Sequence, residues 1–168
     1  MTQTFSSART SIRQVSKPYK IHLDKFGFEK GATILDFGGG RFDDAKNFMQ
    51  KYDVKVMVYD PYNRSNEHNR KVISAVMKKT PSYIICANVL NVIKENEVVE
   101  DVVKKIKRLA GPNTLCIFSV YEGNGTGHGR QTGPDQYQRN QKTDSYVPMI
   151  RRYFPNAIKK YGMIYARR

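Results

Sequence analysis

Short apolar runs alternate with amphipathic stretches along the chain. Continuous apolar runs at 32–37, 54–59, 82–87 and 114–121 predict four buried strands. Between them, apolar side chains recur at three- and four-residue steps, which predicts helices. The clearest helix is 95–109, with acidic side chains in its first turn and basic ones in its last. This order predicts an α/β fold, a Rossmann-like and mostly parallel sheet with helices on both faces and a ligand site at the carboxyl ends of the strands.

The remaining segments complete the prediction. We expect short helices at 18–26, after the first strand and at 67–79, then a final helix at 145–154 and a final strand at 159–168. The region 122–143 is rich in glycine and is expected to be a loop that orders on binding a ligand. We interpret residues 1–168 as a single domain, in which 1–30 form a basic N-terminal arm and helix.

Length and composition narrow the class of protein. No apolar stretch approaches the roughly 18–20 residues needed to span a bilayer, and the polar start lacks the apolar centre of a signal peptide. We therefore expect a cytoplasmic protein with no membrane partner. Cys86 and Cys116 lie inside apolar runs, which favours buried, reduced thiols. Neither has the spacing of a metal ligand, and no metal is predicted.

The positive charge is unevenly distributed. The formal net charge is +14, of which +4 lies in residues 1–30, +3 in 31–122 and +7 in 123–168. Basic segments at both ends favour a polyanionic partner, above all nucleic acid, through contacts with phosphates. A solvated surface that keeps the protein soluble is the alternative.

The candidate chemistry begins where the first strand runs into the Gly38-Gly39-Gly40 turn. Glycines allow the backbone to approach a ligand closely. NAD is disfavoured because Asp43 stands where a dinucleotide fold has its third glycine and because Asp36 directly precedes the turn. A phosphate-binding P-loop lacks its Gly-Lys-Ser/Thr. Asp36 suits an amino-bearing cofactor, and Asp60, at the end of the second strand, can accept the hydroxyls of a ribose.

In sequence, ILDFGGG, VMVYDPYN and IICANVLNVI resemble the first, second and fourth motifs of class I S-adenosylmethionine-dependent methyltransferases. Together with LDFGGGRFDD and the late QTGPDQYQRNQK and SYVP segments, most of the chain resembles methyltransferase-like proteins of phages and mobile elements and those associated with DNA phosphorothioation.

The resemblance implies S-adenosyl-L-methionine as the cofactor. Asp36 with Gly38 and Gly40 would hold its methionine moiety, Asp60 its ribose, and Asn88 would lie where the methyl group is presented. The full set of implied cofactor-binding residues is Asp36, Phe37, Gly38, Gly39, Gly40, Asp43, Asp60, Pro61, Asn88 and Val89. The alternative for Asp36, Asp43 and Asp60 is capping of the turns that follow them, and for Asn88 local turn hydrogen bonding.

The acceptor is less clearly indicated. DNA amino-methylating enzymes carry paired prolines at the fourth motif, whereas this chain has Asn88-Val89-Leu90-Asn91. Cytosine-C5 methylation needs an activated cysteine, and neither Cys86 nor Cys116 has that setting. The interleaved aromatic and basic residues after 121 suit stacking and phosphate contacts. They supply the predicted substrate-binding residues Arg130, Tyr137, Arg139 and Lys142, while the catalytic candidates are Asn88, Tyr121 and His128.

Three functions therefore remain open. The leading hypothesis is a methyltransferase with a nucleic acid or nucleotide-like acceptor, and a protein partner would supply target recognition because the chain has no room for a separate recognition domain. The second is a non-catalytic S-adenosylmethionine-binding or nucleic-acid-binding accessory subunit. The third is an enzyme that cleaves the cofactor.

Overall fold

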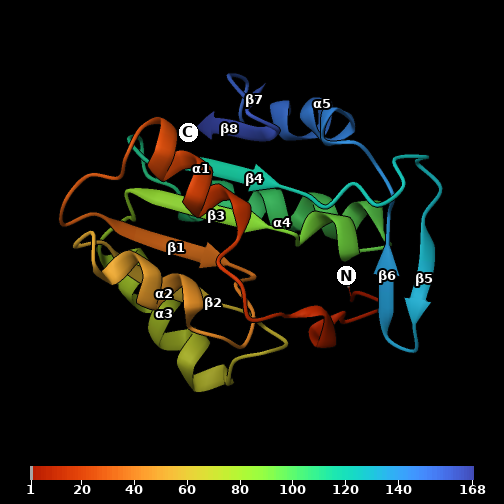
Figure 1. The fold of residues 1–168 in the computed structure, drawn as a ribbon, viewed down its shortest axis with the longest axis horizontal. Coiled ribbons are helices and arrows are strands. Elements are labelled where there is room, and N and C mark those ends of the chain that lie inside the picture. The colour runs from red at the N-terminus through yellow and green to blue at the C-terminus, as the bar shows by residue number, and fades with distance from the viewer. Residues whose placement is uncertain (1) are drawn as a thin grey trace.

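Six strands form one central sheet in the computed structural model, which describes residues 2–168 (Figure 1). Four of them run parallel, namely β1 (Thr33–Phe37), β2 (Lys55–Tyr59), β3 (Tyr83–Ala87) and β4 (Leu115–Ser119). The last two, β7 (Ile158–Lys160) and β8 (Met163–Arg167), form a hairpin whose β8 pairs antiparallel with β4. The order across the sheet is β2-β1-β3-β4-β8-β7. The predicted α/β fold with a mostly parallel sheet is confirmed.

Helices cover both faces of this sheet. On one face lie α1 (Lys17–Lys25) and α2 (Asp44–Gln50), and on the other lie α3 (Asn66–Lys78), α4 (Asn96–Leu109) and α5 (Val147–Arg151). Successive strand side chains point to opposite faces, so Ile34 packs with the first layer and Leu35 with the second. Two apolar cores result, and both strand residues are fully buried.

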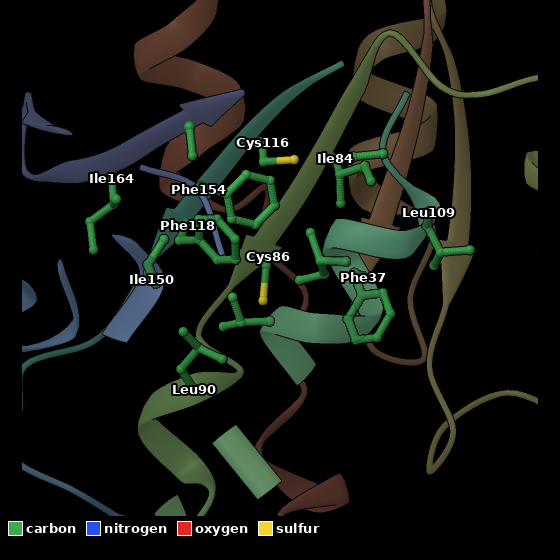
Figure 2. Packing of buried hydrophobic residues seen from close by; sticks show 14 of the residues in the cluster. Phe37, Ile84, Cys86, Leu90, Leu109, Cys116, Phe118, Ile150, Phe154 and Ile164 are labelled. Atoms are coloured by element: carbon green, nitrogen blue, oxygen red, sulfur yellow. The ribbon is translucent and has the colours of Figure 1, made fainter. Parts of the chain in front are cut away.

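The core between the sheet and the second layer contains both cysteines. Figure 2 shows Cys86 and Cys116 among Phe118, Phe154 and other apolar side chains of this cluster. Both are buried and free, as predicted. Burial raises the pKa of the Cys116 thiol to about 12, so this thiol stays protonated and unreactive at neutral pH.

The region predicted as a glycine-rich loop differs from the prediction. Within 122–143 the chain forms a small antiparallel hairpin of β5 (Arg130–Gly133) and β6 (Gln136–Gln138). Its turn is held from outside, because the backbone N–H of Ser7 donates to the carbonyl of Asp135 at 2.9 Å. A contact across 128 residues of sequence leaves no local signal, which is why composition alone suggested a loop.

Other boundaries shift in the C-terminal part. The predicted helix 145–154 is a 3-10 turn, η3 (Thr143–Tyr146), followed by the short α5, which ends at Arg151. The predicted strand 159–168 is divided by a Tyr161-Gly162 turn into β7 and β8. Two further 3-10 turns, η1 (Ala8–Thr10) and η2 (Leu90–Val92), lie beside the carboxyl ends of the strands. No helix within residues 2–168 combines the length and apolar character needed to cross a membrane.

Candidate functional site

A pocket of about 210 Å³ lies at the carboxyl ends of β1, β2 and β3. Its floor comes from the ends of these strands, and one wall comes from the segment before α1. The structure brings nine of the ten predicted cofactor-binding residues to this pocket: Asp36, Phe37, Gly38, Gly39, Gly40, Asp60, Pro61, Asn88 and Val89. The parallel topology therefore gathers motifs that are separated by up to 53 residues in the sequence.

The glycine turn, residues 38–40, is shaped so that no side chain fits there. Gly38 has φ 79° and donates its N–H to the carbonyl of Tyr59 at 2.7 Å. A Cβ at this position would lie 2.3 Å from Cγ2 of Val89, and one at Gly40, with φ 77°, would lie 2.3 Å from Oγ of Ser11. Only a glycine backbone leaves this wall of the pocket open for a ligand.

Asp36 is a buried carboxylate at the base of the pocket. It is 5% exposed, and its Oδ2 accepts a hydrogen bond of 2.8 Å from the phenol of Tyr19 on α1. Burial raises the pKa of Asp36 to about 6, the Tyr19 hydrogen bond opposes that shift, and the charge of Asp60 adds to it. A cationic ligand would stabilise the ionised form of this buried carboxylate. The ammonium of an amino-acid cofactor is such a cation.

Asp60 organises the turn that follows β2. Its Oδ1 accepts from the backbone N–H groups of Tyr62 and Asn63, both at 2.9 Å, and its Oδ2 accepts from the N–H of Gly40 at 2.9 Å. The amide of Asn63 makes a longer contact of 3.3 Å with Oδ2. These four donors fill the acceptor positions of a carboxylate. Asp60 thus caps the turn and ties it to the glycine turn.

Asp43 is the one predicted cofactor residue that does not line the pocket. Its carboxylate pairs with the guanidinium of Arg64 at 2.8 Å. Arg64 also donates to the carbonyls of Gly40 at 2.8 Å and Phe42 at 3.0 Å. Sequence reasoning missed Arg64, which fastens the glycine turn from behind. A single arginine outside every motif gave no signal of this function.

Asn88 follows β3 in an unusual backbone conformation. Its φ is 58°, its N–H donates to the carbonyl of Ser119 at 2.9 Å, and its side chain is exposed at the pocket. Asparagine tolerates this left-handed geometry better than other non-glycine residues. Conformations of this kind cluster at ligand sites, and here the turn leads directly to Val89, which packs against Gly38.

An N-terminal arm, residues 2–16, forms one wall of the pocket, as its positive charge suggested. Ser7, Ser11 and Gln14 are among its lining residues, and Oγ of Ser11 accepts the N–H of Arg41 at 3.1 Å. Ser6 donates its N–H to the carboxylate of Asp135 at 2.8 Å, at the turn of the β5–β6 hairpin. Figure 1 shows the arm passing beneath the strand ends toward this hairpin.

The predicted acceptor residues lie outside the pocket lining. His128, Arg130 and Lys142 are exposed, and Tyr121 is 64% exposed beyond β4. These four belong to the segment that carries the hairpin.

Two further predicted acceptor residues already have partners within the protein. Tyr137 stacks on Phe5 of the arm, with ring centroids 5.6 Å apart and planes inclined by 12°. Arg139 donates to the carbonyls of Ile93 at 2.9 Å and Lys94 at 3.0 Å, next to the start of α4. Its guanidinium therefore anchors the hairpin to the domain.

The family described as a methyltransferase domain matches residues 11–162. Among solved structures, the chain is similar to a 1,6-didemethyltoxoflavin-N1-methyltransferase from Burkholderia thailandensis with bound S-adenosylhomocysteine, with a TM-score of 0.65 and 16% identity over 90% of this chain and 77% of that one. A sugar N-methyltransferase from Streptoalloteichus gives a TM-score of 0.56 and 10% identity over 97% and 87% of the two chains. A SAM-dependent methyltransferase from Aquifex aeolicus gives 0.53 and 15% over 89% and 86%. None of the curated proteins matches the sequence.

Proposed function

The chain belongs to the methyltransferase domain family and uses S-adenosylmethionine as its cofactor, and from this premise we propose that it transfers the methyl group to a nucleic acid or nucleotide-like acceptor. The choice of acceptor rests on one observation. The two basic segments of the chain, at its N-terminal and C-terminal ends, meet beside the pocket. The arm lines the pocket, and it is hydrogen-bonded to the hairpin of the C-terminal segment.

The pocket residues fit this cofactor. In the proposal, the ionised carboxylate of Asp36 holds the methionine ammonium, and the backbone of the glycine turn follows the same moiety. Asp60 receives the ribose, whose hydroxyl displaces the amide of Asn63, the longest of the four contacts to that carboxylate. The bound cofactor supplies an electrophilic methyl group on its sulfonium. Asn88, exposed at the end of β3, orients the acceptor beside it.

Basic and aromatic side chains surround the arm and favour a polyanion. Exposed Arg9 and Arg13 belong to the arm itself. The ammonium of Lys94 lies 6.0 Å from the ring of Phe5, which stacks on Tyr137. Such a combination suits contact with phosphates and bases of a single strand. The motif resemblance to proteins of phages and mobile elements supports the same class of acceptor.

The test is transfer of a labelled methyl group from S-adenosylmethionine to purified DNA, RNA and a small-molecule extract. We expect label in nucleic acid with the natural chain and none with Asp36→Ala, because that variant lacks the carboxylate for the ammonium. Nucleic-acid affinity is also expected to fall steeply between 50 and 200 mM salt, by about a hundredfold if a handful of phosphates are contacted.

The outcomes separate the alternatives. Label confined to the small-molecule extract would overturn the nucleic-acid acceptor and retain the methyltransferase. Cofactor binding without transfer to any pool would indicate an accessory subunit. Breakdown products of the cofactor in the absence of every acceptor would indicate cleavage.

A further inference from the structure

A second cavity, of about 400 Å³, lies at the edge of the sheet opposite the cofactor pocket. Its lining includes Tyr83 and Leu115, the first residues of β3 and β4, so it opens at the amino ends of the parallel strands. In Figure 1 this is the edge beside the loop between α1 and β1, away from the arm and the hairpin. The volume falls within the range of small-molecule sites. No function described above uses it.

Aromatic rings dominate this cavity. The ring of His22 on α1 lies at their centre, with centroids 4.7 Å from Phe28, 5.5 Å from Tyr83 and 5.9 Å from Tyr165. The ring of Phe26 is 5.1 Å away on the same side. The planes are tilted or edge-on to one another. The rings therefore pack against one another and form a wall of the cavity, against which a flat ligand can lie.

Two buried polar atoms in this cluster have no hydrogen-bond partner within residues 2–168. They are Nδ1 of His22, which is 4% exposed as a residue, and the hydroxyl of Tyr165, which is 8% exposed. Burial, and then the charge of Arg167, lowers the pKa of His22, so its ring is neutral at pH 7 and carries one donor and one acceptor nitrogen. Buried polar groups are nearly always satisfied, so this cluster holds hydrogen-bonding capacity that the described residues do not use.

The rim of the cavity adds exposed aromatics and cations. Phe26 is 53% and Tyr161 is 43% exposed, and their ring centroids are 5.8 Å apart. The ammonium of Lys160 lies 5.3 Å from the first ring and 5.2 Å from the second, and that of Lys25 lies 5.7 Å from the second. Arg167 lines the cavity itself. Glu29 also lines the cavity, and Lys25 pairs with Asp24 at 3.2 Å. Three cations and two acids therefore leave an excess of positive charge beside two accessible ring faces.

Tyr161 occupies this rim at a conformational cost. With φ 51° it forms, together with Gly162, the two-residue turn between β7 and β8. Turns of this kind favour Asn-Gly, and a bulky residue with a positive φ is a true outlier. A tyrosine does not improve the turn, so the reason for it lies in what the ring contacts.

From these observations we infer that the aromatic cavity and its rim bind a nucleotide unit. The base lies against the rings that line the cavity, and the phosphate lies toward Arg167, which lines this cavity and the adjoining one. An adjoining, more polar cavity shares Tyr83 and Arg167 and gives room for the sugar. Free nucleotides and single-stranded nucleic acid both present this chemistry. Because the site faces away from the transfer pocket, its occupant is a ligand and not the group that is methylated.

The experiment titrates the full chain with AMP, inorganic phosphate and a 12-nucleotide single-stranded DNA by calorimetry. S-adenosylhomocysteine is present at saturation throughout, so that the cofactor pocket cannot accept the nucleotide. We expect saturable binding of AMP or of the oligonucleotide. Comparable affinity for the two indicates a free nucleotide as the source, and much tighter binding of the oligonucleotide indicates nucleic acid.

Two variants separate binding from folding. Tyr161→Asn places a favoured residue in the turn, and His22→Phe keeps a ring while removing the unpartnered nitrogen, so both are expected to fold at least as well as the natural chain. We expect each to weaken nucleotide binding by at least about fivefold, the lower end of the effect of losing a base-stacking contact. Tyr52→Asn, which removes another exposed tyrosine after α2, is the matched control and should bind normally.

Three results would overturn the inference: no binding of either nucleotide probe, unchanged affinity in both variants, or displacement of AMP by an equal concentration of inorganic phosphate. Binding that both variants weaken while methyl transfer is retained belongs to this cavity, whereas binding that neither variant changes belongs to the acceptor side of the transfer pocket, so the variants distinguish failure of this inference from failure of the proposed function.

Discussion

The phenol of Tyr19 donates a hydrogen bond of 2.8 Å to Oδ2 of Asp36, and both side chains are buried. Tyr19 lies on α1 and Asp36 on β1, so this contact fixes the first helix over the strand that carries the glycine turn. It also partly offsets the cost of holding a carboxylate away from water, a cost that the protein bears at its ligand site.

The buried charge of Asp36 predicts a trade-off between stability and cofactor binding. An acid whose pKa is raised to about 6 contributes stability below its unfolded value near 4, and this contribution is lost as pH rises through 6. Asp36→Asn should therefore raise the free energy of unfolding at pH 8, by up to about 3 kcal/mol, with little change at pH 4. Denaturant unfolding at the two pH values measures this.

The same Asp36→Asn variant should lose cofactor affinity, by about tenfold or more, because a neutral amide does not compensate the methionine ammonium. Calorimetry with S-adenosylhomocysteine checks the loss. A variant that is less stable at pH 8, or that binds the cofactor normally, would contradict this view of Asp36.

Removing the Tyr19 hydroxyl should change the pH dependence of binding. Its hydrogen bond opposes the upward shift in the pKa of Asp36, so Tyr19→Phe should raise that pKa further. Cofactor binding, measured from pH 5 to 8, should then reach half its maximum at a higher pH than in the natural chain. Tyr52→Phe, at an exposed site, is the control. Parallel pH profiles for the two variants would show that the hydroxyl has only a structural function.

A side chain at Gly38 would collide with Val89 in addition to straining the backbone. We therefore expect a substitution there to reduce cofactor binding more than the positive φ alone would. Gly38→Ala combines a positive φ with a Cβ 2.3 Å from Val89, whereas Gly127→Ala has the similar φ of 78° and no atom within 4 Å. Each should lose about 1–2 kcal/mol from its backbone, and Gly38→Ala should lose more stability and cofactor affinity. Adding Val89→Ala to Gly38→Ala should restore part of the stability. Equal losses of stability and affinity in Gly38→Ala and Gly127→Ala would show that the contact with Val89 is not the cause.

Arg64 and Asp43 should differ in their importance for the pocket. Asp43→Asn removes a half-exposed ion pair worth up to about 1 kcal/mol and should leave cofactor affinity unchanged. Arg64→Lys cannot bond the carbonyls of Gly40 and Phe42 together, so the glycine turn loosens and affinity should fall by about tenfold. Calorimetry on both variants decides the question. A larger loss for Asp43→Asn would mean that this carboxylate contacts the cofactor.

The strand and helix pattern was predictable because it rests on local periodicity. The 95–109 helix is found as Asn96–Leu109, and the four parallel strands lie within one or two residues of their predicted bounds. The motif residues also followed from sequence, since parallel strands bring their carboxyl ends to one edge. The hairpin at 130–138 did not follow, because its turn is held by Ser6 and Ser7 at the other end of the chain.

The sequence by itself determined the α/β order, the glycine turn with its acids at 36 and 60, and the concentration of positive charge at both ends. Only the tertiary structure decided that the arm forms a wall of the pocket, that Arg64 fastens the glycine turn, and that His22 stands among rings at the opposite edge of the sheet. The physical reason is the separation in sequence over which each interaction acts. Periodicity and turn chemistry act between near neighbours in the chain, whereas these contacts join segments that meet only when the sheet has formed.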